Sequence, residues 1–208
     1  MYLLYIKSDF NLDLAPNIAY YLEQNRDLLI KKSVEKRKGN RPWFELFRAR
    51  SEEYLIQSPK IIIRQTGDSI IAAIDNVGYY SIDSTNVILL KKEYICEIDF
   101  LLALLNSRII KFFYQEISQE GGRVLAQVKP IRVKSLPIPN ASDLDKNMIK
   151  ELVKESMSRR ISDPIADISE IDNQIDRLVY QLYGLTYEEI LIIDPETPIT
   201  REEYESSN

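Results

Sequence analysis

The stretch IDFLLALLNSRIIKFFYQEISQEGGRVLAQVKPIRVKSLPIPN, residues 98–140, decides the fold of this chain. Its first part is an apolar run from Phe100 to Phe113 that is interrupted at Asn106-Ser107. Such a run predicts a buried helix of roughly 25 Å, at about 1.5 Å per residue. Asp99 is the expected N-cap, because its carboxylate can accept the free amide hydrogens of the first turn.

The second part of this stretch turns and then becomes basic. Gly121-Gly122 are the only adjacent glycines in the chain, and they allow the backbone to turn freely. The following segment, Arg123–Lys134, is expected to be partly a strand. Pro137 and Pro139 then force extended backbone, which makes 136–140 a linker.

Upstream of this stretch, the pattern predicts a helix and then a sheet. Pro16 suits the first turn of a helix that we expect to reach about Lys32. Four apolar segments are expected strands, the second and third joined by a hairpin turn at 75–78: Lys60–Arg64, Ser69–Ile74, Tyr79–Ile82 and Val87–Leu90. We therefore expect an α/β (α+β) fold, a mixed or antiparallel sheet with packed helices, followed by a C-terminal helical region.

The region after residue 140 is expected to be helical. Ser142-x-x-Asp145 and Thr186-x-x-Glu189 are capping-box patterns that each open a helix. Between them an apolar seam recurs at helical spacing: Ile168, Ile171, Ile175, Leu178 and Leu182. The seam pairs either with the 143–160 helix or with another protein. Asp194–Asn208 holds two prolines and many acids, so we expect it to be mobile.

The composition excludes several kinds of chemistry. The chain has no histidine, which closes Cys-His and Ser-His-Asp catalysis and most zinc sites. Its six glycines form no G-x-G, and no two prolines are adjacent, so dinucleotide and phosphate loops and the Asn-Pro-Pro-aromatic motif are absent. The single cysteine, Cys96, agrees with a reducing cytoplasm. No stretch reaches the roughly 20 apolar residues of a membrane span.

Charge is distributed unevenly along the chain. The net charge is −5, but residues 1–150 hold 22 Lys+Arg against 18 Asp+Glu, whereas residues 151–208 hold 5 against 14. The body is therefore mildly basic, at +4, and the C-terminal region is acidic, at −9. A mildly basic body permits nucleic-acid binding without requiring it.

Two basic segments are candidate contact surfaces. Residues 31–41 form the segment with the highest density of Lys and Arg. These cations either lie at a solvated helix C-terminus, where the helix dipole favours them, or contact phosphates. Residues 123–134 either guard an exposed strand edge or read DNA, since Arg can grip guanine and Gln adenine through two hydrogen bonds. Trp43 is a packing residue or a base-stacking platform. The candidate DNA-binding residues are Lys36, Arg37, Lys38, Arg41, Arg48, Arg50, Arg123, Gln127, Lys129, Arg132 and Lys134.

Three stretches together resemble a known family. A helix ending in LLNS, a Gly-Gly loop, a basic segment and LPIP resemble the TaqI-like C-terminal specificity domain. Pro16–Trp43, where PNIAYYLEQNRDLL is followed by RPWFEL, resembles the family's entry helix and its Arg-x-Trp-aromatic-Glu-Leu motif. Ile175–Ile190 resembles its closing helix pair. The family is the target-recognition region of type IIG restriction-modification enzymes and related adenine-N6 methyltransferases, and is related to type I specificity subunits. The resemblance covers about residues 16–193.

This resemblance implies a non-catalytic, cytoplasmic module that binds double-stranded DNA. Its partner would be a methyltransferase domain or subunit, which would carry S-adenosylmethionine, so that no cofactor is expected on this chain. We expect a DNA target-recognition domain at 1–140, a helical docking or spacer region at 141–193 and the mobile acidic tail at 194–208. The alternative is a protein-interaction module that uses the helical seam and does not contact DNA.

Overall fold

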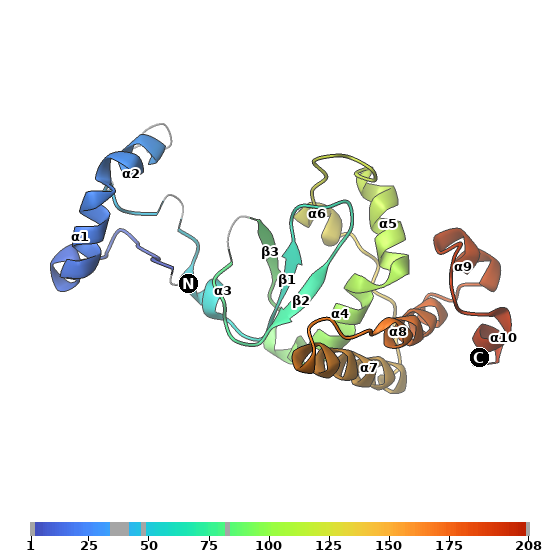
Figure 1. The fold of residues 1–208 in the computed structure, drawn as a ribbon. Coiled ribbons are helices and arrows are strands. Elements are labelled where there is room, and N and C mark those ends of the chain that lie inside the picture. Colours follow the sequence, from blue (N-terminus) through green and yellow to red (C-terminus); the bar gives the residue numbers. More distant parts are fainter. Residues whose placement is uncertain (1–2, 34–41, 47–48, 82–83, 207–208) are drawn as a thin grey trace. The chain divides into compact units, whose positions relative to one another are not determined.

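The computed structural model describes residues 3–33, 42–46, 49–81 and 84–206. The chain forms two compact units, Met1–Tyr54 and Leu55–Asn208. The described residues combine helices with a three-stranded antiparallel sheet, so the expected mixed α/β class is confirmed (Figure 1). No helix in the described ranges is both long and apolar enough to cross a membrane.

The first unit contains a helical pair rather than the single helix expected from Pro16 to Lys32. After η1 (Leu12–Leu14), α1 runs from Pro16 to Gln24, with its proline in the first turn as expected. The break follows at Asn25, whose side chain donates to the carbonyl of Tyr21, and α2 (Arg26–Ser33) then begins. Trp43 packs edge-on against Phe44, and the guanidinium of Arg26 lies 5.1 Å from its ring centroid.

In the second unit, the sheet has the order β2-β1-β3 with both pairs antiparallel. The short helix α3 (Glu52–Ile56) leads into β1 (Lys60–Arg64), which is followed by β2 (Ala72–Asp75) and β3 (Thr85–Ile88). The predicted hairpin between 69–74 and 79–82 is wrong, since β2 pairs with β1 and described residues 79–81 lie outside any strand.

A buried ion pair explains why that hairpin does not form. Lys60, fully buried, places its ammonium 2.9 Å from the carboxylate of Asp75, its partner in the β1–β2 register. Asp75 also accepts the amides of Val77, Gly78 and Tyr79 at 2.7–3.0 Å, and Lys60 donates to the carbonyl of Tyr79 at 2.8 Å. Residues 77–79 are therefore folded around the carboxylate and cannot continue as a strand.

The break between α4 (Ile98–Asn106) and α5 (Arg108–Ser118) is the main departure from the expected single helix. The predicted N-cap at Asp99 is also wrong, because η2 (Lys92–Glu97) leads directly into α4, whose N-cap is Glu97. Ser107 is extended, with φ −66° and ψ 152°, and its hydroxyl accepts the amide hydrogen of Ile110 and donates to the carbonyl of Leu104. Ser107 thus ends one helix and caps the next.

The residues on either side of Ser107 bind partners that are distant in the sequence. The Asn106 amide donates to the carbonyl of Ala72 and accepts its N–H, at 3.0 and 2.9 Å, so it pairs with β2 as a neighbouring strand would. The backbone amide of Arg108 donates to Asp176 at 2.9 Å, and its guanidinium lies 3.2 Å from Asp176 and 3.4 Å from Asp194.

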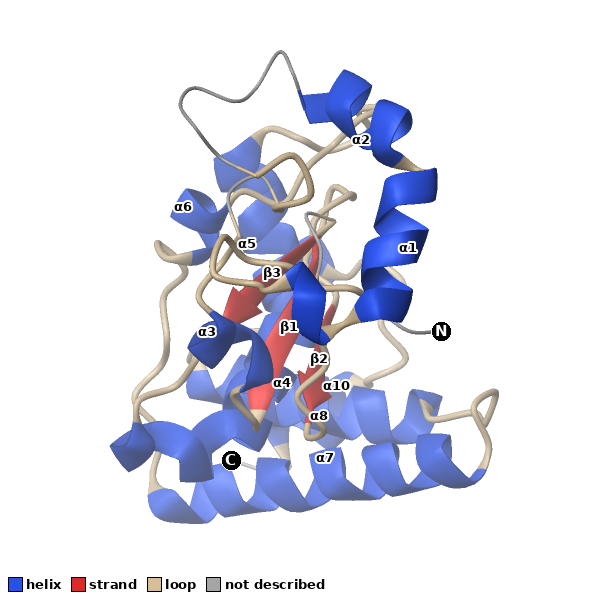
Figure 2. Ribbon diagram, turned by 90° about the vertical axis from the view of Figure 1, so that its left-hand side faces the viewer, coloured by secondary structure: helices blue, strands red, loops and turns tan. Residues whose placement is uncertain are grey.

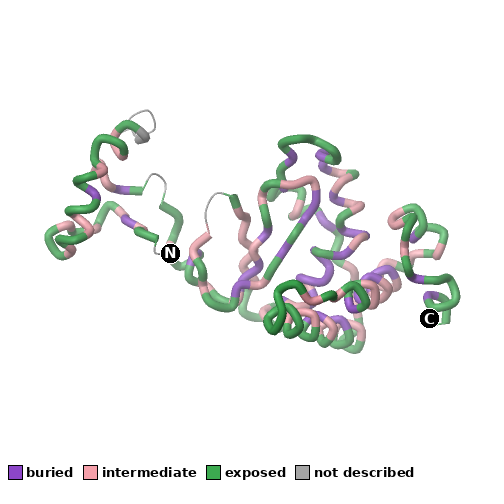
Figure 3. The backbone as a smooth tube through the Cα atoms, in the orientation of Figure 1, coloured by how far each residue is buried: buried purple, intermediate pink, exposed green. Residues whose placement is uncertain are grey.

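The remaining helices pack in the same unit. They are α6 (Pro130–Val133), α7 (Asp143–Ser162), α8 (Ser169–Leu182), α9 (Tyr187–Ile193) and α10 (Arg201–Glu205). α4 packs on the sheet and against α7, and α8 lies beside α7 (Figures 1 and 2). Buried backbone is concentrated on the strands, α4, α5 and α8, where one apolar core runs from Ile61 to Tyr204 (Figure 3).

Both predicted helix caps are present, but only the one at Thr186 is a full capping box. Ser142 caps α7 and Thr186 opens α9 with Glu189. In the seam, Ile171 and Ile175 are buried, so the 143–160 helix is a partner of the seam. Residues 201–205 form α10 with a further capping box, in a segment that was expected to be mobile. The boundaries at 140 and 193 do not coincide with the division between the units, and the separate roles of those regions stay predictions.

Removal of the Asp75 carboxylate should destabilise the second unit. Burial alone would raise the pKa of Asp75, but Lys60 and three backbone amides outweigh burial and hold that pKa below its usual value. Asp75→Ala leaves a buried, uncompensated ammonium, and we expect a loss of about 3–5 kcal/mol in the free energy of unfolding, measured by urea denaturation. Glu151→Ala, in an exposed ion pair with Lys154, should cost no more than about 1 kcal/mol. Equal losses would contradict the role of the pair.

Asp176 should make the second unit more stable at mildly acidic pH than at neutral pH. Burial raises the pKa of Asp176 to about 6. The negative charges of Asp172 and Asp194 raise it further, whereas the backbone amide and the positive charge of Arg108 lower it. A raised pKa means that the folded protein binds the proton more tightly, so stability increases as pH falls through 6. From pH 8 to pH 5 we expect a gain of about 1.4 kcal/mol that Asp176→Asn lacks, measured by denaturation at both pH values. Parallel wild-type and variant profiles would contradict this assignment.

Candidate nucleic-acid interface

The loop 119–129, which joins α5 to α6, consists of two successive turns. The amide of Arg123 donates to the carbonyl of Glu120 at 3.2 Å, with Gly121-Gly122 in the middle of the turn, and Gly122 has φ +71°. The amide of Ala126 then donates to the carbonyl of Arg123 at 3.3 Å, which leaves Val124-Leu125 in the middle of the second turn. The loop therefore has a defined tip formed by two apolar residues.

A buried carboxylate holds the base of this loop. Glu120 is 4% exposed, and its Oε1 accepts Lys129 Nζ at 2.6 Å and Arg123 Nη1 at 3.3 Å. The hydrogen bond from Lys129 is the largest influence that lowers the pKa of Glu120, and the amide of Gln127 and the charges of Lys129 and Arg123 add to it against burial. One acid thus clamps the two sides of the loop.

The end of the loop is paired to the connection between β1 and β2. The amide of Gly67 donates to the carbonyl of Ala126 at 2.9 Å, and the amide of Val128 donates to that of Gln65 at 2.7 Å. Thr66 and Gln127 form the bridge between these two segments. The hydroxyl of Tyr114 on α5 accepts the amide of Lys129 at 2.8 Å. The sheet end and α5 therefore fix the direction in which the loop projects.

The predicted strand 123–134 is correct only in part. Residues 126–129 alternate as a strand does, with Ala126 and Val128 buried and Gln127 and Lys129 exposed. Residues 130–133 instead form the helical turn α6, with Pro130 in its first turn. Proline lacks the amide hydrogen that a strand would need there and suits a first helical turn.

The structure divides the candidate residues of the basic segment into two groups. Arg123 and Lys129 are exposed but bound to Glu120. Arg132 and Lys134 are exposed and form no ion pair with any residue in the described ranges. Gln127 is exposed, and its carbonyl accepts the hydroxyl of Tyr114. Their roles toward DNA stay predictions.

The candidate residues of the first unit are mostly beyond what the structure describes. Arg50 is exposed, and its carbonyl accepts the hydroxyl of Tyr5. The other candidates lie outside the described residues: Lys36, Arg37, Lys38, Arg41 and Arg48.

Arg64 is not among the candidate residues predicted from the sequence, where it was expected only as the end of a strand. Arg64 ends β1, is exposed and lies beside the loop, since Thr66 bridges to Gln127. Its guanidinium lies against Gly67, where an added Cβ would be 2.7 Å from Nη2 and where φ is +149°. The available signal was the charged end of KIIIR with a glycine, Gly67, three residues beyond it.

Together these residues present cations, an amide and apolar side chains at one end of the sheet. Such a surface can bind an anionic polymer through charge and can contact bases through the amide and guanidinium groups. No group of three His, Cys, Asp or Glu side chains that could hold a metal occurs within the described part of the chain.

Comparison with known proteins identifies the family. Residues 17–138, more than half of the chain, match the family model described as the TaqI-like C-terminal specificity domain. The match contains the sheet, α4, α5 and the loop, and ends before α7. No curated protein matches the chain.

Glu120→Gln should loosen the loop without unfolding the unit, because it removes the charge that Lys129 and Arg123 share. We expect faster amide hydrogen exchange in residues 119–129 at pH 7 and unchanged exchange in α4. In the wild type, the same loosening should appear as pH falls through the lowered pKa of Glu120, since that carboxylate stabilises the loop only while ionised. Glu116→Gln, an exposed neighbour on α5, is the matched control. Equal exchange in both variants would show that Glu120 does not clamp the loop.

Proposed function

The chain belongs to the TaqI-like C-terminal specificity domain family, and we propose that it is the part of a restriction-modification system that recognises a double-stranded DNA sequence. The family match carries this proposal, and the surface around the 119–129 loop supports it. Phosphate contacts would set the register, and base contacts would supply the sequence preference.

The clamp suggests how this work is divided among the basic residues. Arg123 and Lys129 share Glu120, so they hold the loop in shape, and their charge is partly neutralised. Gln127 and Arg132 are exposed and carry the side chains that can form paired hydrogen bonds to adenine and guanine. Lys134 would neutralise a phosphate.

Chemistry would be carried elsewhere, on an adenine-N6 methyltransferase domain or subunit in the same cytoplasm. That enzyme would extrude the target adenine and bind S-adenosylmethionine. This chain has neither the glycine-rich turn nor the Asn-Pro-Pro-aromatic motif that such chemistry uses. The chain itself would set where methylation occurs.

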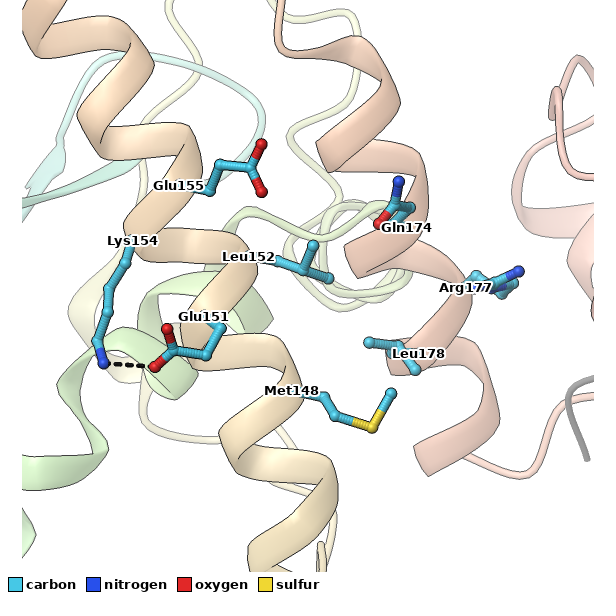
Figure 4. A pocket seen from close by; sticks show the side chains of 8 residues that line it. All are labelled: Met148, Glu151, Leu152, Lys154, Glu155, Gln174, Arg177 and Leu178. Atoms are coloured by element: carbon cyan, nitrogen blue, oxygen red, sulfur yellow. Dashed lines mark hydrogen bonds and ion pairs between the residues drawn. The ribbon is translucent and has the colours of Figure 1, made fainter.

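The helical region 141–193 would dock this module onto the enzyme. A groove of about 560 Å³ between α7 and α8 supports this role (Figure 4). Its floor includes Met148, Leu152 and Leu178, and Glu155 and Arg177 also line it. Grooves of this kind accept the apolar face of a partner helix.

The alternative function is a protein-interaction module that uses the apolar seam of α8 and does not contact DNA. Ile171 and Ile175 of the seam are buried within the chain's own core, and α8 contacts both α7 and α5. This part of the seam is therefore covered by the chain itself, whereas Leu178 lines the groove between α7 and α8.

Selection from a pool of random duplexes at low salt tests the proposed function. The chain should retain duplexes that share a short motif, because base contacts favour particular sequences. Gln127→Ala and Arg132→Ala should relax the preference by about 1–3 kcal/mol at the affected positions, measured by competition between matched and mismatched duplexes. Lys134→Ala should weaken all duplexes alike and reduce the salt slope by about one.

Arg159→Ala is the matched control, because Arg159 is an exposed arginine on α7 that pairs with Glu155. It should leave motif and affinity unchanged. Absence of retention at low salt would rule out DNA recognition by the isolated chain and turn attention to protein docking.

A further inference from the structure

The tip of the 119–129 loop exposes two consecutive apolar side chains. Val124 is 97% exposed and Leu125 is 83% exposed. Single exposed apolar residues are common on protein surfaces. These two differ because they occupy the middle of a turn whose base is clamped by Glu120 and paired to residues 65–67. The fold therefore holds an apolar tip in water in a fixed position.

The surroundings of this tip favour a polyanion as the binding partner. Residues 119–134 contain four cations, Arg123, Lys129, Arg132 and Lys134, and Glu120 is their only acid. Glu120 offsets one of these four charges, so the segment that carries the tip has a net charge of +3. The partner must accordingly combine negative charge with a small apolar group.

Duplex DNA has one apolar group on its base edges, the C5 methyl of thymine, and it lies in the major groove. Gln127 is two residues beyond Leu125, and the paired hydrogen bonds that Gln can form with adenine are made in that same groove. The loop thus places an apolar tip and an adenine-binding amide within reach of one groove.

We propose that Val124 and Leu125 contact thymine methyl groups in the major groove, so that the recognised sequence contains thymine at the positions that the tip reaches. This inference rests on the proposed DNA recognition. The apolar tip would then contribute to sequence preference in a way that a charged residue cannot, because a methyl group offers only apolar contact.

Replacement of thymine by uracil tests this inference, because it removes the methyl group and keeps the base pair. The duplex recovered from the random pool is prepared with thymine or with uracil at each thymine position in turn. Wild-type affinity should fall about fourfold for each contacted methyl. The variant Val124→Ser/Leu125→Ser should bind the two duplexes equally, with its thermal unfolding unchanged because both side chains are exposed.

Val77→Ser is the control variant. Val77 is 71% exposed and follows β2, at the opposite end of the antiparallel sheet from the turn that holds the loop. This variant should keep the wild-type difference between thymine and uracil.

Two results would overturn the inference while leaving DNA recognition intact. The wild type could bind thymine and uracil duplexes equally, or the difference could persist in Val124→Ser/Leu125→Ser. If the tip instead inserts between base pairs, the wild type would bind thymine and uracil duplexes equally. Increased fluorescence of a 2-aminopurine placed beside the insertion would identify this case. A pool that yields no motif would instead overturn the proposed function itself, and the inference with it.

Discussion

Three consecutive polar residues, Asn106, Ser107 and Arg108, impose the constraint on which the second unit depends. Ser107 is buried, Arg108 is partly buried and Asn106 is exposed, and each of them binds a partner. For Ser107 a partner is required, because an unpaired buried polar group is costly. Asn106 pairs with the backbone of β2, Ser107 caps α5, and Arg108 binds Asp176 on α8 and Asp194. A continuous helix could not satisfy all three, so α4 and α5 separate here and the sheet, α5 and α8 become fixed relative to one another.

The direction of α5 in turn determines where the 119–129 loop lies. Tyr114 on α5 and residues 65–67 at the sheet end hold the loop from two sides, and Glu120 closes its base. If the chain recognises DNA as proposed, this arrangement would let a protein with net charge −5 do so.

Short-range features of the fold were predictable because they depend on neighbouring residues. Pro16 in a first helical turn, Ser142 and Thr186 as caps, and the strand Lys60–Arg64 all agree with the structure. The single long helices at Pro16 and Phe100 were wrong, since apolar periodicity does not reveal a break made by side-chain hydrogen bonds. The hairpin after β2 was wrong for a related reason, because Asp75 and Lys60 organise that turn from positions 15 residues apart.

The sequence by itself determined the family, the mixed class, the helix caps at Ser142 and Thr186 and the location of the basic segment at 123–134, because each depends on residues that are close in the sequence. Only the tertiary structure decided which of those cations are bound to Glu120 and which pair with no acid among the described residues. It also decided that Arg64 lies beside them and that Val124 and Leu125 form an exposed tip. The physical reason is that a buried polar group or a surface position is defined by its partners in space. Residues such as Asn106 and Ala72 find each other only when the chain has folded.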